Sequence, residues 1–96
     1  MMEDKLLTVT HDLVKQNFDI DQQELFVEEA LAKRIEELMN SNPILLKSIF
    51  YRIDLNESKL GMALVSMQGP ELFIELARQV IERLKLKAET RLKYSK

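Results

Sequence analysis

The stretch NSNPILLKSIFYRIDLNESKL, residues 40–60, holds the signals that end one helix, form a second and begin a third. Asn42 can accept a backbone N–H bond as an N-cap, and the proline after it suits a first helical position, where a missing N–H loses no bond. Asn56 supplies the next cap in the same way. The stretch therefore predicts a short helix over 43–53, a tight corner, and another helix from Asn56 to about residue 67.

The middle of this stretch is dense in polar residues, but each has a structural role in the predicted corner. Glu57 lies in a first helical turn, where the helix dipole favours an anion, and Arg52 lies in a last turn, where it favours a cation. Leu55 and Leu60 occupy the two positions of a hydrophobic staple around the cap. The face that helix 43–53 turns to the core consists of Leu45, Leu46, Ile49, Phe50 and Ile53. The polar residues therefore indicate a corner rather than a reaction site.

The residues before the corner predict a longer helix over 22–40. Asp21 is a good N-cap, and Glu24, three residues on, completes a capping box. The apolar side of this helix consists of Val27, Leu31, Ile35, Leu38 and Met39. Residues 5–17 are expected to be helical as well, because their apolar residues have a loose three-to-four spacing, although a β-branched run weakens the pattern.

After the corner, a Gly-Pro pair breaks the chain, and Pro70 begins a last helix that runs towards residue 92. Its apolar side consists of Phe73, Ala77, Val80, Ile81, Leu84 and Ala88. Arg91 enters the edge of this stripe, so the helix is expected to leave the core beyond Leu84. A basic helical end is then predicted from about residue 85.

Together these segments predict one all-α domain over residues 1–96, a small bundle of four or five helices in which the two short helices form a corner. The chain has two Gly and two Pro among its 96 residues, which leaves few places for hairpin turns. A chain of this length can form a core without disulfides or metals. It has no long apolar run, and its first residues include acids, which predicts a cytoplasmic protein without a membrane span.

Catalytic and metal-binding patterns are missing from the sequence. There is no Cys, and His11 is the single histidine, so a thiolate site, an ordinary zinc site or a catalytic triad has too few groups. The run from Asp19 to Glu24 opens like a calcium loop but lacks the Gly and the later Glu that such a loop requires. We therefore expect no enzyme activity, no cofactor and no metal.

The run ILLKSIFYRIDLNESKLGMAL, residues 44–64, resembles the helix-turn-helix of bacterial repressors. The matching positions are the apolar Ile49, Ile53, Leu55, Leu60 and Leu64 and the cap Asn56. The run departs from that pattern at Phe50, where a small residue is usual, and at Asp54, where glycine is usual. The resemblance implies a DNA-binding element, whereas the outer face of the second helix offers only Lys59 among the residue types that read bases.

A broader run, LLKSIFYRIDLNESKL, resembles small bacterial helical proteins that carry a Phe/Leu-Tyr-Arg-Ile-Asp box ahead of a Glu-x-Lys. Here the box is FYRID, residues 50–54, and the Glu-x-Lys is residues 57–59. This resemblance implies a bacterial, helical protein and no particular activity.

Four apolar residues are candidates for contact with another protein. They are Ile44, Tyr51, Met62 and Val65, which point away from the core stripes of the two short helices. Gly61 lies among them, and inside a helix it costs about 1 kcal/mol relative to Ala, so it can mark the close approach of another helix. The other interpretation, which stays open, is that Gly61, Met62 and Val65 pack under the N-terminal segment of the same chain.

Three basic residues near the C-terminal end, Arg83, Lys87 and Arg91, are candidates for contact with an anion. Residues 1–40 hold ten acidic and four basic residues, a net charge of −6, and residues 82–96 hold two acidic and six basic residues, a net charge of +4. Opposite charges attract, so the basic end is expected to meet the acidic half, within one chain or across a symmetric dimer.

These patterns predict a non-enzymatic protein-protein interaction or structural module, most simply a homodimer or a small adaptor. The alternative is a helix-turn-helix-like protein that binds nucleic acid through residues 43–67 and the basic end.

Overall fold

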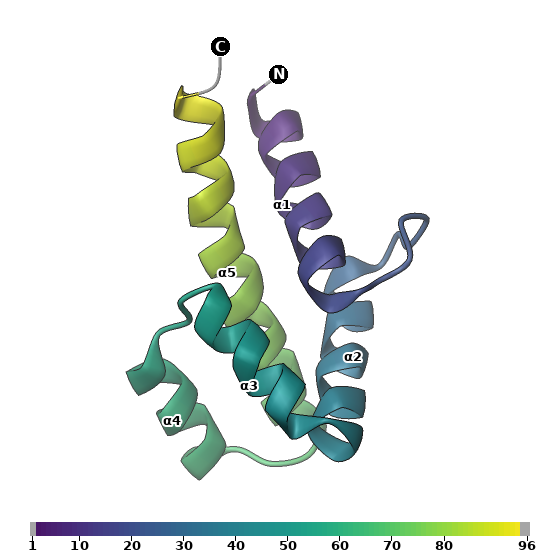
Figure 1. Cartoon of the computed structure of the whole chain (residues 1–96), viewed down its shortest axis with the longest axis vertical. Helices are drawn as coiled ribbons and strands as arrows, with labels where there is room; N and C mark the ends of the chain where they lie inside the picture. Colours follow the sequence, from purple (N-terminus) through teal and green to yellow (C-terminus); the bar gives the residue numbers. More distant parts are fainter. Residues whose placement is uncertain (1, 95–96) are drawn as a thin grey trace.

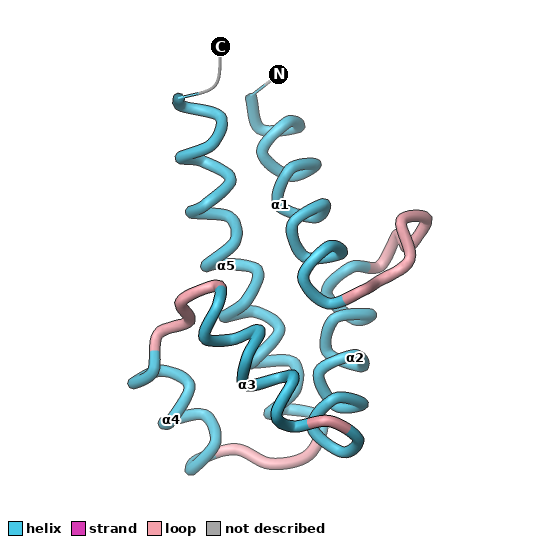
Figure 2. Tube along the Cα trace, in the orientation of Figure 1, coloured by secondary structure: helices cyan, strands magenta, loops and turns pink. Residues whose placement is uncertain are grey.

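The computed structural model describes residues 2–94, with side chains from residue 4 onwards. Over that range the chain forms five α-helices and no strand (Figure 1, Figure 2). They are α1 (Met2–Phe18), α2 (Val27–Ser41), α3 (Pro43–Arg52), α4 (Glu57–Ser66) and α5 (Pro70–Tyr94). The predicted all-α bundle is confirmed, and none of the helices in the described range is long and apolar enough to cross a membrane.

The longest helix, α5, is the element along which the others are arranged. It contacts α1, α2 and α4, and α1 runs antiparallel to it, so that the two ends of the described chain lie near each other (Figure 1). Ala88 is fully buried and Leu92 is half-buried, so the expectation that α5 leaves the core beyond Leu84 is wrong. The reason is that α1 covers this part of α5, where Leu6 and Leu92 line a shared hollow.

The buried apolar side chains form one cluster. Its largest fully buried members are Phe18, Leu31, Ile35, Leu76, Leu84, Val14 and Val80. The rings of Phe18 and Phe50 join α1 to α3, with their centroids 6.4 Å apart and their planes tilted by 56°. The stripe predicted for α5 was incomplete, because Leu72 and Leu76 are buried as well.

The start of α2 differs from the prediction, because the helix begins at Val27 and not at residue 22. The carboxylate of Asp21 accepts a bond from the N–H of Gln23 at 2.7 Å, and that of Glu24 accepts from the N–H of Phe26 at 3.0 Å. Each carboxylate thus bonds two residues ahead and stabilises a turn, so the predicted capping box is wrong.

Two cations bind backbone carbonyls, one within this turn and one before it. Lys15 is buried, and its Nζ donates to the carbonyl of Gln22 at 2.8 Å. Arg34 Nε donates to the carbonyl of Phe18 at 2.9 Å. These bonds join α1, the 19–26 loop and α2. They stabilise a loop at residues 22–26, where the local sequence favours a helix.

Both asparagine caps of the corner are confirmed. The side chain of Asn42 accepts a bond from the N–H of Leu45 at 3.2 Å, and that of Asn56 accepts from the N–H of Lys59 at 3.0 Å. Leu45 is 39% exposed, so its predicted place in the core is wrong. The buried face of α3 is narrower than expected and consists of Leu46, Ile49 and Phe50, with Ile53 just after the helix.

Candidate functional site

An apolar groove lies between α3 and α4 and has a volume of about 440 Å³. Its apolar lining consists of Met39, Pro43, Leu46, Phe50, Leu55, Leu60 and Leu64. Tyr51 and Lys47 line it from α3, and Glu57 lines it from the start of α4. This groove is the largest apolar concavity that we find in the described chain, and we treat it as the candidate site.

The groove exists because the two short helices pack on different neighbours. α3 packs on α2, whereas α4 packs on α5. Ala63 is the single buried residue of α4, so α4 rests on α5 through a small side chain and leaves most of its surface open. The turn between the helices contains Asp54 at a φ of 60°, a left-handed conformation that reverses the chain tightly.

Large exposed apolar side chains flank the groove. Tyr51 is 83% exposed and Ile44, two helical turns before it on the same side of α3, is 82% exposed. On α4, Val65 is 89% exposed and follows Leu64, which lines the groove. The interpretation that Val65 and Met62 pack under the N-terminal segment is therefore wrong, because both are open to solvent.

Met62 is exposed on a different flank of α4 from the groove. It lines a shallow depression between α4 and α5 together with Ser66, Met67 and Gln79. Of the four predicted contact residues, Tyr51 lines the groove and Ile44 shares its ridge on α3. Val65 and Met62 do not line the groove, and Met62 lines the depression towards α5. Met62 and Val65 are three positions apart on α4 and are neighbours on its exposed side.

Gly61 occupies open space within α4. A Cβ built on it meets no described atom within 4 Å, apart from its own helix backbone and chain neighbours. The close approach that its presence predicted is therefore not made by another part of the described chain.

The charges of the corner are nearly balanced. Arg83 of α5 pairs with Asp54, with Nη2 3.3 Å from Oδ2, and its Nε donates to the carbonyl of Ile53 at 3.0 Å. After this pairing, Lys47 and Glu57 are the remaining charges that line the groove. Arg83 therefore acts at the corner and is not a free anion contact.

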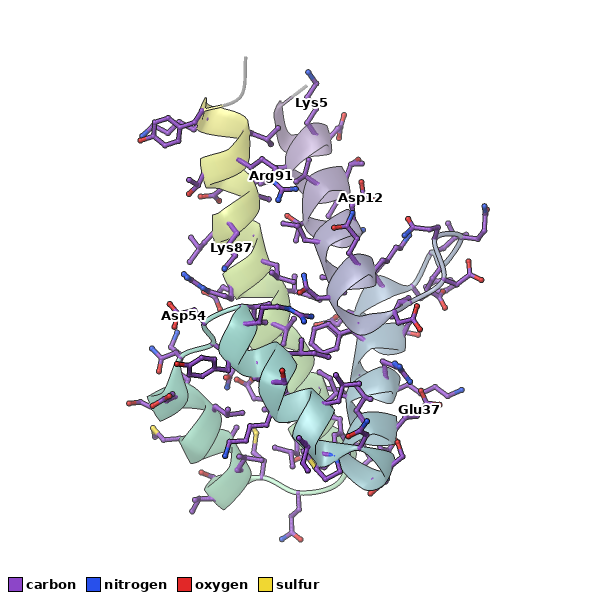
Figure 3. The ribbon with its side chains drawn as sticks, in the orientation of Figure 1. Lys5, Asp12, Glu37, Asp54, Lys87 and Arg91 are labelled. Atoms are coloured by element: carbon purple, nitrogen blue, oxygen red, sulfur yellow. The ribbon has the colours of Figure 1, made fainter. Side chains whose placement is uncertain are left out.

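The other basic candidates lie along the part of α5 that faces α1. Figure 3 shows Lys87 and Arg91 on α5, with Lys5 on α1 near the same end of the molecule. Lys87 is half-buried and Arg91 is exposed. The ion pairs of the described residues are Arg34–Glu37, Arg78–Glu28 and Arg83–Asp54, so none joins residues 83–94 to the acids of residues 4–40. Within one chain, the predicted meeting of the basic end with those acids is not seen among the described residues.

Sequence reasoning missed two exposed apolar residues in the 19–26 loop. Leu25 is 83% exposed and Phe26 is 66% exposed. Both fall within the helix predicted over 22–40 and lie off its apolar stripe. That position outside the stripe was the signal that could have identified them.

No protein-family model, curated protein or solved structure matches this chain.

Proposed function

We propose that this protein is a non-enzymatic interaction module that associates with itself through the groove between α3 and α4 and the apolar residues beside it. The observation that carries the proposal is an open apolar groove lined by the exposed Tyr51, with Val65 exposed on the outer side of α4. Large apolar surfaces next to a concavity mark contact sites, because their burial removes apolar area from water. A cytoplasmic location in a bacterial cell is part of this proposal.

The dimensions of the groove suit a helix as its occupant. α3 and α4 each contain ten residues, and a helix of that length extends about 15 Å. An amphipathic helix of about three turns can lie in such a groove and present apolar anchors at every third or fourth position. Nothing in this mode of binding requires a catalytic group, a cofactor or a metal.

Light scattering coupled to size exclusion tests the proposal. We expect the measured mass to rise from 11.3 kDa towards twice that value as the concentration enters the micromolar range. Val65→Lys should keep the protein monomeric, because a lysine beside the groove would have to be desolvated on association. Ser66→Lys is the matched control, since it puts the same charge on the side of α4 that lines the depression towards α5 and should leave association intact. A wild-type protein that stays monomeric throughout contradicts the proposal.

Nucleic-acid binding through residues 43–67 and the basic end is the alternative function, and it has less support. Arg83 is held by Asp54, and the open side of α4 carries Gly61 and Val65 rather than side chains that read bases. The alternative predicts binding to mixed duplex and single-stranded DNA at low salt, with an affinity that falls steeply as salt is added. Fluorescence anisotropy measures this, and absence of binding at low salt excludes it.

A further inference from the structure

We propose that two copies of the chain associate about a two-fold axis by crossing their α4 helices at Gly61, so that each α4 lies over the groove of the other copy. This inference rests on the proposed self-association and adds the geometry of the contact. It makes Gly61 the residue that determines how closely the two copies approach.

The first observation is that the described chain gives no internal reason for a glycine at position 61. Gly69 adopts a φ of +66°, which L side chains rarely adopt, so a glycine is required there. Gly61 lies inside a helix without a positive φ, and a Cβ added to it meets no described atom within 4 Å beyond its own helix and neighbours. Alanine would therefore stabilise α4 in the isolated chain. A second backbone that passes close to position 61 is a reason for the glycine.

The second observation is the surface that surrounds Gly61. The helical repeat places Ser58 and Val65 on the same side of α4 as Gly61, and Leu64 continues this side into the groove. Small residues let two helix backbones approach, and a neighbouring large apolar residue can then enter the opposite groove. Val65, the most exposed of the large apolar side chains, is placed to enter the groove of the other copy.

The chain has enough exposed surface for an interface with a second copy. The chain exposes 6949 Å², roughly 1,200 Å² more than the surface expected for a compact monomer of 11.3 kDa. A stable dimer of standard size buries about 800 Å² on each partner. The excess belongs to the whole elongated chain, whose extents are 41 × 29 × 21 Å, and it is larger than the area that one such interface covers on each partner.

The charges of the groove favour the same occupant. A two-fold contact places a surface against itself, so the surface must be complementary to itself. With Asp54 paired to Arg83, the groove keeps one cation, Lys47, and one anion, Glu57. Each can face the opposite charge of the other copy. A strongly acidic or strongly basic partner would find no such balance.

Sedimentation equilibrium on Gly61→Ala is the test, with Ser66→Ala as the matched control on the other flank of α4. Gly61→Ala should raise the unfolding midpoint measured at dilute, monomeric concentration and yet weaken association by about tenfold or more, because the added methyl group forces the backbones apart. Ser66→Ala should leave the dissociation constant unchanged. An unweakened Gly61→Ala dimer, with Val65→Lys monomeric, overturns the crossing at Gly61 and leaves the proposed self-association standing. A monomeric wild type overturns both.

Discussion

Arg83 of α5 holds Asp54 in the turn between α3 and α4. Its Nη2 lies 3.3 Å from Oδ2 of Asp54, and its Nε donates to the carbonyl of Ile53 at 3.0 Å. Asp54 is also one of two non-glycine residues in the described chain with a positive φ, at 60°. The ion pair and the left-handed turn together determine how the two short helices diverge, and therefore how wide the groove between them is.

Replacing Asp54 by glycine and by alanine separates these two contributions. Both variants lose an ion pair whose aspartate is mostly exposed, a loss of about 0–1 kcal/mol. Alanine must in addition adopt the left-handed conformation, which costs it about 1 kcal/mol relative to glycine. We expect Asp54→Gly to be the more stable of the two in urea unfolding followed by circular dichroism. A less stable glycine variant would contradict this account of the turn.

Lys15 is expected to stabilise the 19–26 loop through its bond to the carbonyl of Gln22. Lys15→Met keeps most of the buried stem but removes the charged donor, so the free energy of unfolding should fall by about 1–2 kcal/mol. Lys33→Met, on the exposed side of α2, is the control and should change it by less than about 0.5 kcal/mol. Chemical denaturation measures both, and equal stability of the two variants would show that the bond contributes nothing.

The contact between α1 and the end of α5 can be tested at Ala88. Ala88→Leu adds three carbons to a fully buried position and should cost about 1–3 kcal/mol through overpacking. Thr90→Leu adds a leucine to the exposed side of the same helix and should be nearly neutral. Thermal unfolding compares the two variants, and an undisturbed Ala88→Leu protein would mean that α1 does not cover α5 there.

Acidification below pH 6.5 should destabilise the protein through His11. Burial, and secondarily the nearby charge of Lys15, hold the pKa of His11 below its ordinary value of 6.5, while Asp12 opposes the shift. The unfolded chain then binds the proton more readily than the folded chain, so stability is complete above pH 6.5 and falls as the pH drops towards the folded pKa. His11→Gln lacks this titration. From pH 7.5 to pH 5.5, the urea midpoint of the wild type should therefore fall further than that of His11→Gln. A constant difference between the two midpoints would contradict the prediction.

The salt dependence of association distinguishes two geometries for the dimer. A contact between the basic end of one copy and the acids of α2 in another should weaken strongly as salt is added, because exposed charges are screened beyond about 8–10 Å. A crossing at Gly61 buries a nearly neutral apolar surface and should change little. Equilibrium sedimentation of the wild type and of the double variant Lys87→Glu/Arg91→Glu, each at low and high salt, distinguishes the two geometries. The charge reversal should abolish a contact between the basic end and the acids, and it should leave a crossing at Gly61 unchanged. Charge reversal suits this purpose better than truncation after Leu84, which would also remove buried Ala88.

Most of the helices were predictable because their signals are local. Asn42 and Asn56 bond to backbone N–H groups three residues ahead, and Pro70 begins α5 as predicted. Such bonds depend on the neighbouring residues alone. The exposed positions of Tyr51 and Val65 also followed from their place off the core stripes.

The tertiary structure decided where α2 begins, how far α5 is buried, and that α3 and α4 enclose a groove. Lys15 binds the carbonyl of Gln22 in the loop, and Arg34 of α2 binds the carbonyl of Phe18 at the end of α1. These tertiary bonds override the local preference of residues 22–26 for helix. Ala88 lies on the predicted apolar side of α5, but its burial depends on α1, which precedes it by most of the chain. The groove forms because α3 and α4 pack on different partners. Contacts between residues distant in sequence leave no periodic pattern, so only the assembled fold could determine these features.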